Sequence, residues 1–497
     1  MAHPGHHAAA RPDDPAVIMA ADGSVTTWAE LHHQAVGTAN LLHDLGLRAG
    51  DPVAFCVENR PEFVALVWAC QYAGFRWTPI STRLTADEAA YIVADCGAGA
   101  LFHSAATAAI TTGSLTAGAT PHVIDVDATP LGTLDGSAPR YDRVEGVSML
   151  YSSGTTGRPK GVWRAAPPEP IEELTDADRL RAAVMEFGDD SVYLSTAPLY
   201  HSAPITFLVQ MGRLGVPTVV MERFDARAAL EAIERHRVTN SQWVPTMFVR
   251  LLRLPDEVRS GVDLSSHRWA IHGAGPCSIA TKRAMLDWWG PIIHEYYAGT
   301  EGAGTCLIGP HEWLEHPGSV GRSVTGRVMV LDDDGNEVPS GEVGQVWFET
   351  GGEFRYLNDD AKTAESRRPT GEGTFGDLGY LDDEGYLYLT DRKSFTIVSG
   401  GVNIYPREIE LVLLEHPSVA DVAVFGVPND EYGEEVKAVV QPTDGVLGSD
   451  ALAAELLEHC QERLAKFKVP RSIDFDPALP REPTGKLRVA HVRDRYV

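Results

Sequence analysis

The 497-residue sequence contains few lysines and few cysteines. Eight lysines stand against 34 arginines, so a lysine inside a glycine-rich segment is less often accidental than in an average protein. The six cysteines form no C-x-x-C pair and no other close metal-binding spacing, which excludes a compact cysteine metal site and a disulfide framework. We therefore expect reduced, mostly buried thiols and a cytoplasmic location.

Long apolar runs are absent as well. The longest, at residues 63–75, contains Gln71 and predicts a core helix, because a membrane span needs about 20 apolar residues. The first 14 residues lack the basic and apolar regions of a signal peptide and predict a mobile tail carrying His3, His6 and His7. With 69 acidic and 42 basic residues the net charge is −27, which argues against nucleic acid or an anionic membrane as the main partner.

The chain length and the pattern along it predict an α/β protein with more than one domain. Residues 191–297 alternate between strand-like and helix-like segments, which favours βαβ units and a largely parallel sheet. Residues 318–391 contain short β segments joined by turn residues and predict a small antiparallel sheet or barrel. We expect a large N-terminal domain at 1–391 and a small, mobile α+β C-terminal domain at 392–497.

The strongest chemical signal is a loop of hydroxyls, glycines and one lysine after a hydrophobic strand at 147–151. Glycines let backbone N–H groups approach phosphate oxygens, while hydroxyls and a lysine add donors and positive charge. A Walker loop does not fit, because Pro159 stands where its second glycine belongs. The pattern predicts another kind of phosphate loop, formed by Ser152, Ser153, Gly154, Thr155, Thr156, Gly157 and Lys160.

This loop resembles the signature loop of the adenylate-forming superfamily, which includes acyl- and aryl-CoA synthetases, luciferases and the adenylation domains of peptide synthetases. In that family it holds the β- and γ-phosphates of ATP, and the resemblance implies this role for Thr155, Thr156 and Lys160. Further motifs follow in the family's order along nearly the whole chain, so the resemblance covers both expected domains.

Four segments resemble the family's nucleotide and metal site. G-A-G-P at 273–276 looks like the loop beside adenine, Y-A-G-T-E at 297–301 looks like the motif that holds adenine, α-phosphate and Mg²⁺, and T-F-G-D with D-R looks like the ribose site. A carboxylate beside a triphosphate requires a cation between them, so Glu301 is the expected Mg²⁺ ligand. The resemblance implies nucleotide contacts by Gly273, Ala274, Gly275, Tyr297, Gly299, Thr300, Asp377 and Arg392.

P-L-Y-H at 198–201 resembles the segment whose histidine lies between acyl pocket and α-phosphate. The chain departs from the family pattern at Pro204 and Ala298, near the expected pocket, and at Phe375, where threonine is usual. The expected pocket wall favours a flat aromatic or compact acid, and it consists of His201, Trp243, His272, Tyr296 and Ala298.

Two segments of the C-terminal domain complete the resemblance. S-G-G-x-N-I at 399–404 looks like the loop that borders the pantetheine tunnel, which assigns Gly400 and Gly401 to the acceptor site. P-T-G-K near the C-terminus implies that Lys486 enters the site for adenylation and is catalytic together with His201, Thr300 and Glu301. Ser394 stands at the expected interdomain hinge.

The resemblance implies an ATP- and Mg²⁺-dependent ligase that forms an acyl-AMP from a carboxylic acid and then transfers the acyl group. Coenzyme A is the favoured acceptor, because the segment 466–471 also resembles that of fatty acyl-CoA synthetases. An amide-forming ligase with an amine acceptor is the alternative. A nucleotide-binding protein without catalysis is a third hypothesis, which the joint presence of Lys160, Glu301, Asp377, Arg392 and Lys486 opposes.

Overall fold

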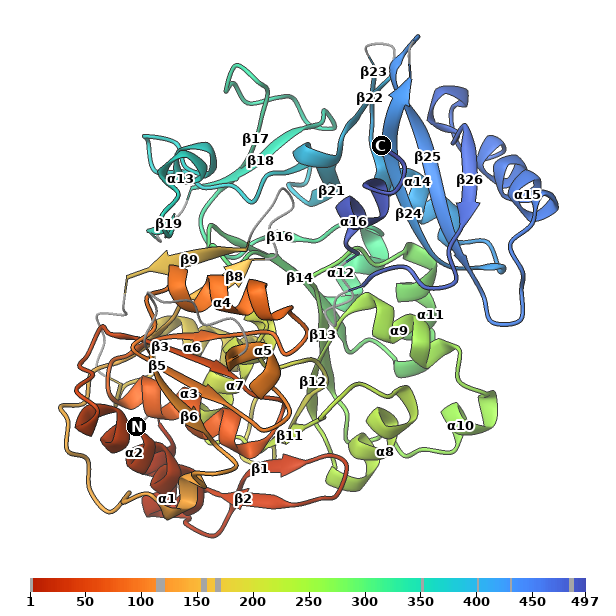
Figure 1. Cartoon of the computed structure of the whole chain (residues 1–497). Coiled ribbons are helices and arrows are strands. Elements are labelled where there is room, and N and C mark those ends of the chain that lie inside the picture. The colour runs from red at the N-terminus through yellow and green to blue at the C-terminus, as the bar shows by residue number, and fades with distance from the viewer. Residues whose placement is uncertain are drawn as a thin grey trace. The chain divides into compact units, whose positions relative to one another are not determined.

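The computed structural model describes residues 3–112, 121–152, 159–165, 171–349, 353–399, 402–429, 431–481 and 487–497 (Figure 1). The chain forms two compact units, one built from 1–243, 249–272 and 352–364 and the other from 244–248, 273–351 and 365–497. The α-helices of the described residues are α1 Pro4–Ala10, α2 Trp28–Asp44, α3 Pro61–Tyr72, α4 Ala86–Asp95, α5 Ala108–Thr112, α6 Asp176–Val184, α7 Ser202–Leu214, α8 Ala226–His236, α9 Pro245–Leu252, α10 Asp256–Ser260, α11 Ile279–Trp289, α12 Pro310–Glu315, α13 Asp360–Ser366, α14 Pro406–Leu414, α15 Asp450–Gln461 and α16 Val489–Arg493.

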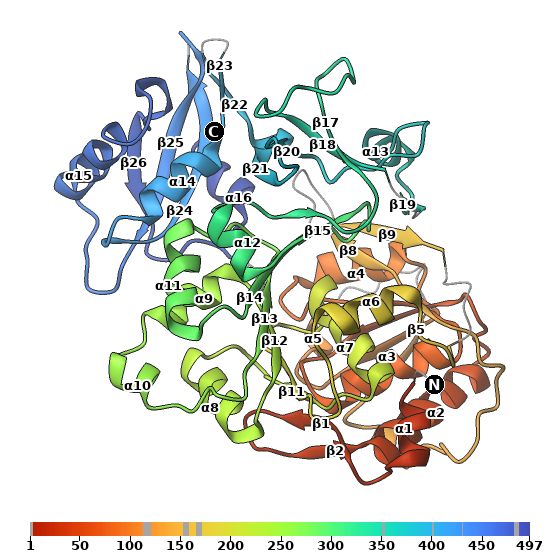
Figure 2. The same cartoon turned by 180° about the vertical axis from the view of Figure 1, so that it is seen from behind.

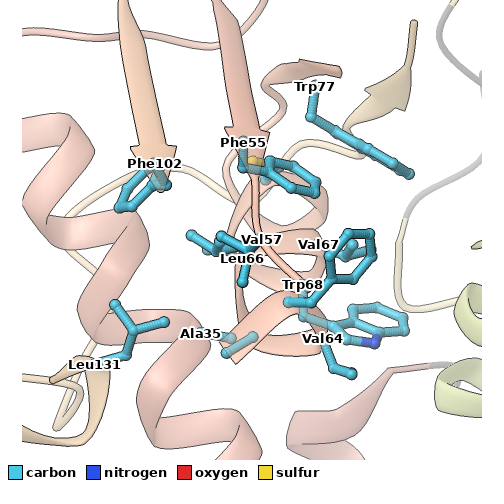
Figure 3. Packing of buried hydrophobic residues seen from close by; sticks show 14 of the residues in the cluster. Ala35, Phe55, Val57, Val64, Leu66, Val67, Trp68, Trp77, Phe102 and Leu131 are labelled. Carbon is cyan, nitrogen blue, oxygen red and sulfur yellow. The ribbon is translucent and has the colours of Figure 1, made fainter. Parts of the chain in front are cut away.

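The first unit contains a five-stranded parallel sheet in the order β6-β5-β3-β4-β7. Its central strand alternates between two cores: Val53 and Phe55 pack with α2 and α3, whereas Ala54 and Cys56 pack with α4. Figure 3 shows Phe55 and Trp77 in the first of these cores together with Trp68 of α3. The strands are β3 Pro52–Cys56, β4 Arg76–Pro79, β5 Ala100–His103, β6 His122–Asp125 and β7 Val147–Ser148.

A second sheet of this unit joins strands far apart in the sequence. Strands β12, β10, β11 and β1 are parallel neighbours with β13 beyond β12, and β2 closes the other edge as an antiparallel hairpin. The expected alternation of strands and helices includes α8, which begins after Asp225, whose carboxylate accepts the Ala228 N–H at 2.9 Å. The strands are β1 Pro15–Met19, β2 Val25–Thr27, β10 Tyr193–Ser195, β11 Thr218–Val220, β12 Asn240–Trp243 and β13 Trp269–His272.

The expected mobile tail at the N-terminus is wrong. Residues 4–10 form α1, and the Gly5 N–H donates to the Tyr72 hydroxyl at 2.9 Å. A ring nitrogen of His7 lies 3.1 Å from the carbonyl of Arg213. These long-range contacts bury His3 and His7, so the segment is ordered by the rest of the unit and not by its own periodicity.

The second unit contains antiparallel strands and the C-terminal α+β region. One segment of it carries β14 Ile293–Ala298, β15 Thr305–Ile308 and β16 Arg322–Ser323, and another forms the predicted small antiparallel sheet in the order β17-β18-β20-β21. The strands of that sheet are β17 Val328–Leu331, β18 Gly344–Phe348, β20 Asp377–Leu381 and β21 Leu387–Arg392.

The C-terminal region has its own sheet, β23-β22-β25-β24 with β26 beside β25. Ile409 of α14 and Leu456 of α15 pack on one face, and Val492 of α16 packs on the other (Figure 2). The α/β class and this small C-terminal region confirm the predicted fold, while the 391/392 boundary stays a prediction. The strands are β22 Ile397–Ser399, β23 Val402–Ile404, β24 Val419–Asn429, β25 Gly433–Pro442 and β26 Ser472–Phe475.

The cysteine prediction is confirmed: all six thiols are free, five of them are buried, and Cys277 is partly exposed. The predicted core helix at 63–75 is α3, whose residues 63–72 are buried. Among the described residues no helix has the length and apolar character needed to cross a membrane.

Candidate active site

The predicted phosphate loop begins and ends on a short antiparallel sheet of the first unit. Ser152, the last residue of β8 (Leu150–Ser152), lies opposite Lys160, the first residue of β9 (Lys160–Arg164), and β9 also pairs with β19 (Phe354–Tyr356). The Lys160 ammonium donates to the carboxylate of Asp359, which lowers the pKa of that carboxyl group. The predicted residues Ser153, Gly154, Thr155, Thr156 and Gly157 lie outside the described residues.

His201 immediately precedes α7, and its ring lies 4.4 Å from that of Tyr200. Its Nε2 is buried and has no hydrogen-bond partner among the described residues. Burial lowers the pKa of His201 to about 3, so the imidazole is neutral at pH 7 and its buried nitrogen is ready for a ligand atom. Pro204, the departure noted near this residue, occupies the first turn of α7, where a missing N–H breaks no helical hydrogen bond.

The other predicted pocket residues differ in exposure. Trp243 and His272 are fully buried at the ends of β12 and β13. The indole N–H of Trp243 donates to Ser241 Oγ at 2.6 Å, and its ring contacts Phe224 edge-on at 6.3 Å. Ala298, at the end of β14, is exposed. These contacts restrict the indole of Trp243 to one orientation, which suits a fixed pocket wall.

The predicted nucleotide residues of the second unit meet around one carboxylate. The Tyr297 hydroxyl donates to one oxygen of Asp377 at 2.5 Å, and Nε of Arg392 donates to the other at 3.0 Å. Burial and the Asp377 charge raise the pKa of Tyr297, so its hydroxyl stays protonated. Burial disfavours the charge of Arg392, but Asp377 and Glu301 outweigh burial and raise its pKa. Tyr297 is 80 residues from Asp377 in the sequence, and Arg392 is 15 residues from it. The fold brings the polar atoms of all three into one network.

Phe375 and Phe348 complete this cluster, and no sequence motif marks Phe348 as a site residue. The Tyr297 ring lies 5.5 Å from Phe375, edge-on, and 6.1 Å from Phe348. A Cβ atom on Gly299 would lie 2.4 Å from the Phe375 ring, so only glycine fits under this aromatic side chain. Phe375 therefore replaces the family's threonine with an apolar contact that fixes Tyr297.

The predicted adenine loop lies beside β14 in the same unit. A Cβ atom on Gly273 would lie 2.5 Å from the ring of Tyr296, so this glycine permits the close approach of that ring. Ala274 has φ +67°, a conformation that alanine rarely adopts. Ala274 and Gly275 are exposed. Strained backbone at such a position is typical of a ligand-binding loop.

Thr300 and Glu301 follow β14 and are partly exposed. No group of three or more acidic, histidine or cysteine side chains that could hold a metal exists within the described ranges. A Mg²⁺ ion bound with a nucleotide keeps several waters and takes only one or two protein carboxylates beside phosphate oxygens. Glu301 stays the predicted carboxylate of this kind.

The predicted C-terminal site residues are described only through their neighbours. Lys486, Gly400 and Gly401 lie outside the described residues, as does the side chain of Ser394. Arg481 and Leu487 form an antiparallel bridge on either side of 482–486, and the Arg481 guanidinium donates to both oxygens of Asp421. Ser399 and Val402, which flank 400–401, line a pocket of about 210 Å³ with Tyr432, Phe467 and Arg471.

A large N-terminal α/β domain followed by a small C-terminal α+β domain is the architecture of an adenylate-forming enzyme. Residues 5–355 match the model of the AMP-binding enzyme family, and residues 408–486 match that of the AMP-binding enzyme C-terminal domain. The chain belongs to this family, which confirms the resemblance stated from the motifs.

Among curated proteins, the chain is 31% identical to the 2-succinylbenzoate–CoA ligase of Bacillus licheniformis over 93% of both chains. It is 34% identical to the feruloyl-CoA synthase of an Amycolatopsis species over 95% of this chain and 94% of the other. Both relatives are acyl-CoA ligases by name.

Two solved structures show the same fold along nearly the entire chain. The o-succinylbenzoate CoA synthetase from Bacillus subtilis in complex with its acyl-adenylate intermediate superposes with a TM-score of 0.82, 28% identity and coverage of 99% and 98%. The amide bond synthetase from Marinactinospora thermotolerans superposes with a TM-score of 0.83, 28% identity and coverage of 98% and 97%.

Proposed function

We propose that this protein activates a carboxylic acid with ATP as an acyl-AMP, releases pyrophosphate, and transfers the acyl group to the thiol of coenzyme A. The observation that carries the proposal is the network in which Tyr297 and Arg392 both donate to the buried carboxylate of Asp377. A carboxylate held by a tyrosine and an arginine suits the two hydroxyls of a ribose, and the adjacent aromatic rings suit adenine.

In the first step, an oxygen of the substrate carboxylate attacks the α-phosphorus of ATP, and the bond to the bridging oxygen of pyrophosphate breaks. Two anions approach each other, so the main requirement is positive charge near the phosphates. Lys160, Lys486 and the phosphate loop would supply it from the protein. A magnesium ion held by Glu301 and phosphate oxygens would add further positive charge.

In the second step, the thiol sulfur attacks the acyl carbon, the bond to the AMP oxygen breaks, and the thiol proton leaves to solvent or base. The pocket beside residues 400–401 supports a large acceptor. Its exposed aromatic side chains, Tyr432 and Phe467, can stack with a base, and Arg471 brings a positive charge. The 2-succinylbenzoate and feruloyl relatives support the same acceptor, since both form CoA thioesters by name.

A compact or aromatic acid is the proposed substrate class. The fixed indole of Trp243 and the neutral imidazole of His201 suit a flat ring with few charges. Relatives with aromatic acyl groups in their names agree with this class. A screen of aromatic, branched and linear acids by pyrophosphate release identifies the preferred member.

The similarity to an amide bond synthetase supports a second candidate function in which an amine accepts the acyl group. Both candidates share the acyl-AMP and differ only in the nucleophile. Each active acid is therefore incubated with ATP and Mg²⁺ and with either coenzyme A or a panel of primary amines, and the products are weighed by mass spectrometry. A thioester at low coenzyme A concentration supports the first function, and an amide without a thioester supports the second.

Lys486→Ala tests the catalytic assignment. We expect ATP–pyrophosphate exchange to fall on the order of 10²–10³-fold, because one charge at the transferring phosphorus is lost. Acyl transfer from chemically prepared acyl-AMP to coenzyme A should persist, because the lysine serves the adenylating conformation. Arg237→Ala removes an exposed cation paired with Asp263 and should change neither reaction. Unchanged exchange in Lys486→Ala would refute the assignment.

A further inference from the structure

The turn at Asn358-Asp359 follows β19 directly and contacts both chain segments that flank the predicted phosphate loop. Strand β19 pairs with β9, with Tyr356 opposite Val162, and the Leu357 N–H donates to the Gly161 carbonyl at 2.8 Å. The turn is therefore held next to Lys160, although 199 residues separate Lys160 from Asp359.

Asp359 is a fixed carboxylate that contacts Lys160. One of its oxygens accepts from the Lys160 ammonium, and the other accepts the Lys362 N–H at 2.9 Å, as an N-cap of α13. The backbone carbonyl of Asp359 also accepts the hydroxyl of Thr363 at 2.9 Å. The helix cap fixes the carboxylate, and the carboxylate in turn restricts the lysine.

Asn358 reaches the opposite flank of the loop. Its amide Nδ2 donates to Asp95 Oδ1 at 3.1 Å, and the other oxygen of Asp95 accepts the Tyr151 hydroxyl at 2.6 Å. Tyr151 immediately precedes Ser152 on β8. Asn358 has φ +55°, which asparagine tolerates better than most residues.

We propose that Asn358 and Asp359 are positioning residues for ATP: the turn holds both flanks of the phosphate loop, and Asp359 orients the Lys160 ammonium toward the phosphates. This inference rests on the proposed function. A lysine has three N–H donors, so Lys160 can keep its contact with Asp359 while it donates to phosphate oxygens. Protein kinases use the same principle, since their phosphate-contacting lysine must be paired with a glutamate.

The expected consequence is weaker ATP binding without the carboxylate. Asp359→Asn removes the charge and keeps a side-chain oxygen for the helix cap, because asparagine and aspartate cap helices equally well. Ordering the Lys160 side chain without this ion pair then opposes binding, and we expect the Kd of Mg·ATP to rise about threefold to tenfold. The KM of the carboxylic acid should stay unchanged, because the acid does not contact this turn in the proposed site.

Isothermal titration of Mg·ATP into the full-length protein measures this effect without turnover. Asp359→Ala removes the helix cap as well as the ion pair with Lys160, so it separates these two roles of Asp359. Equal Kd values of Mg·ATP for the Asn and Ala variants assign the effect to the ion pair. Asp359→Asn should add little in a Lys160→Met background, because the aspartate acts through the lysine. Asn358→Gly keeps the positive φ, loses the amide, and should also raise the Kd.

Asp190→Asn is the matched control, because Asp190 is an exposed carboxylate of the same unit that pairs with Arg268. Its Kd for Mg·ATP should equal that of the unaltered protein. Wild-type-like or tighter binding by Asp359→Asn overturns the positioning role, as does a loss that appears only in the Ala variant. Failure of the unaltered protein to bind Mg·ATP would instead refute the proposed function.

Discussion

Phe375 gives the nucleotide site an apolar side chain where the family pattern has threonine. Its ring packs edge-on against Tyr297 and covers Gly299, so one substitution affects two motif residues. The departure at Phe375 is visible in the sequence, but the contacts of its ring with Tyr297 and Gly299 depend on the fold of the intervening chain and could not be predicted.

A double substitution tests this packing. Gly299→Ala should raise the KM of ATP by about tenfold or more, because its Cβ displaces the Phe375 ring and with it Tyr297. Phe375→Thr restores the usual residue and removes the ring, so Gly299→Ala should cost little in that background. The KM of ATP in ATP–pyrophosphate exchange is measured for the four proteins. Independent effects of the two substitutions would contradict the proposed contact.

Asp359 is a residue whose contact with Lys160 could not be predicted from the sequence. Lys160 was selected from the sequence because lysines are scarce and this one ends a glycine-rich loop. The sequence around Asp359 does not indicate a contact with Lys160, because an aspartate before a short helix is explained by helix capping alone. The pairing of β9 with β19 brings Asp359 next to Lys160, and the sequence does not predict that pairing.

At the scale of helices and strands, an ion pair fixes α11 against β14 below the adenine loop. Lys282 of α11 donates to Glu295 of β14 at 2.6 Å, and both side chains are buried. The ammonium also lies 4.8 Å from the centroid of the Trp313 ring. Burial lowers the pKa of Lys282, whereas the Glu295 charge opposes that shift.

Lys282→Met should reduce the free energy of unfolding by about 3–5 kcal/mol, because it leaves the buried Glu295 charge without this cation. Adding Glu295→Gln should recover a large part of the loss, since no buried charge then remains at the pair. Urea unfolding followed by tryptophan fluorescence and circular dichroism measures both variants. A loss below about 1 kcal/mol for the single variant would show that the pair behaves like an exposed one.

Elements with strong local signals were predictable from the sequence. Asp225 and Ser278 begin α8 and α11 as their capping residues indicate, and Pro406 begins α14. Helix α1 was not predictable, because its seven residues show no apolar periodicity and owe their order to Tyr72 and Arg213. Capping and first-turn residues determine where α8, α11 and α14 begin, whereas contacts with distant residues order α1.

The whole molecule combines a net charge of −27 with deeply buried basic groups. Among the described residues, at least five lysines form ion pairs, and these pairs reduce the positive charge available to an anionic substrate. The net charge follows from the sequence, whereas the partners of these lysines follow only from the fold.

Buried histidines make the stability of the whole protein sensitive to acid. Burial lowers the pKa of His201 and of His267 to about 3, and those of His3, His7 and His32 are lowered as well, from an ordinary value of 6.5. Between these values the unfolded chain binds more protons than the folded protein, so the free energy of unfolding rises with pH. The stabilisation is fully present above about pH 6.5 and declines as the pH falls toward the folded pKa values.

His267→Gln should flatten this dependence. His267 is buried, and its Nε2 lies 2.6 Å from Ser241 Oγ; glutamine keeps a polar side chain but cannot take up a proton. Between pH 6 and pH 5 the slope of unfolding free energy should decrease by up to about 1.4 kcal/mol per pH unit, the value for one proton. Urea unfolding at pH 7, 6 and 5 measures the slope, and His311→Gln at an exposed position should leave it unchanged. Few carboxylates titrate above pH 5, so relief of the repulsion between them changes the free energy of unfolding too little in this range to hide the effect. An unchanged slope in His267→Gln would show that His267 is not the group that takes up the proton on unfolding.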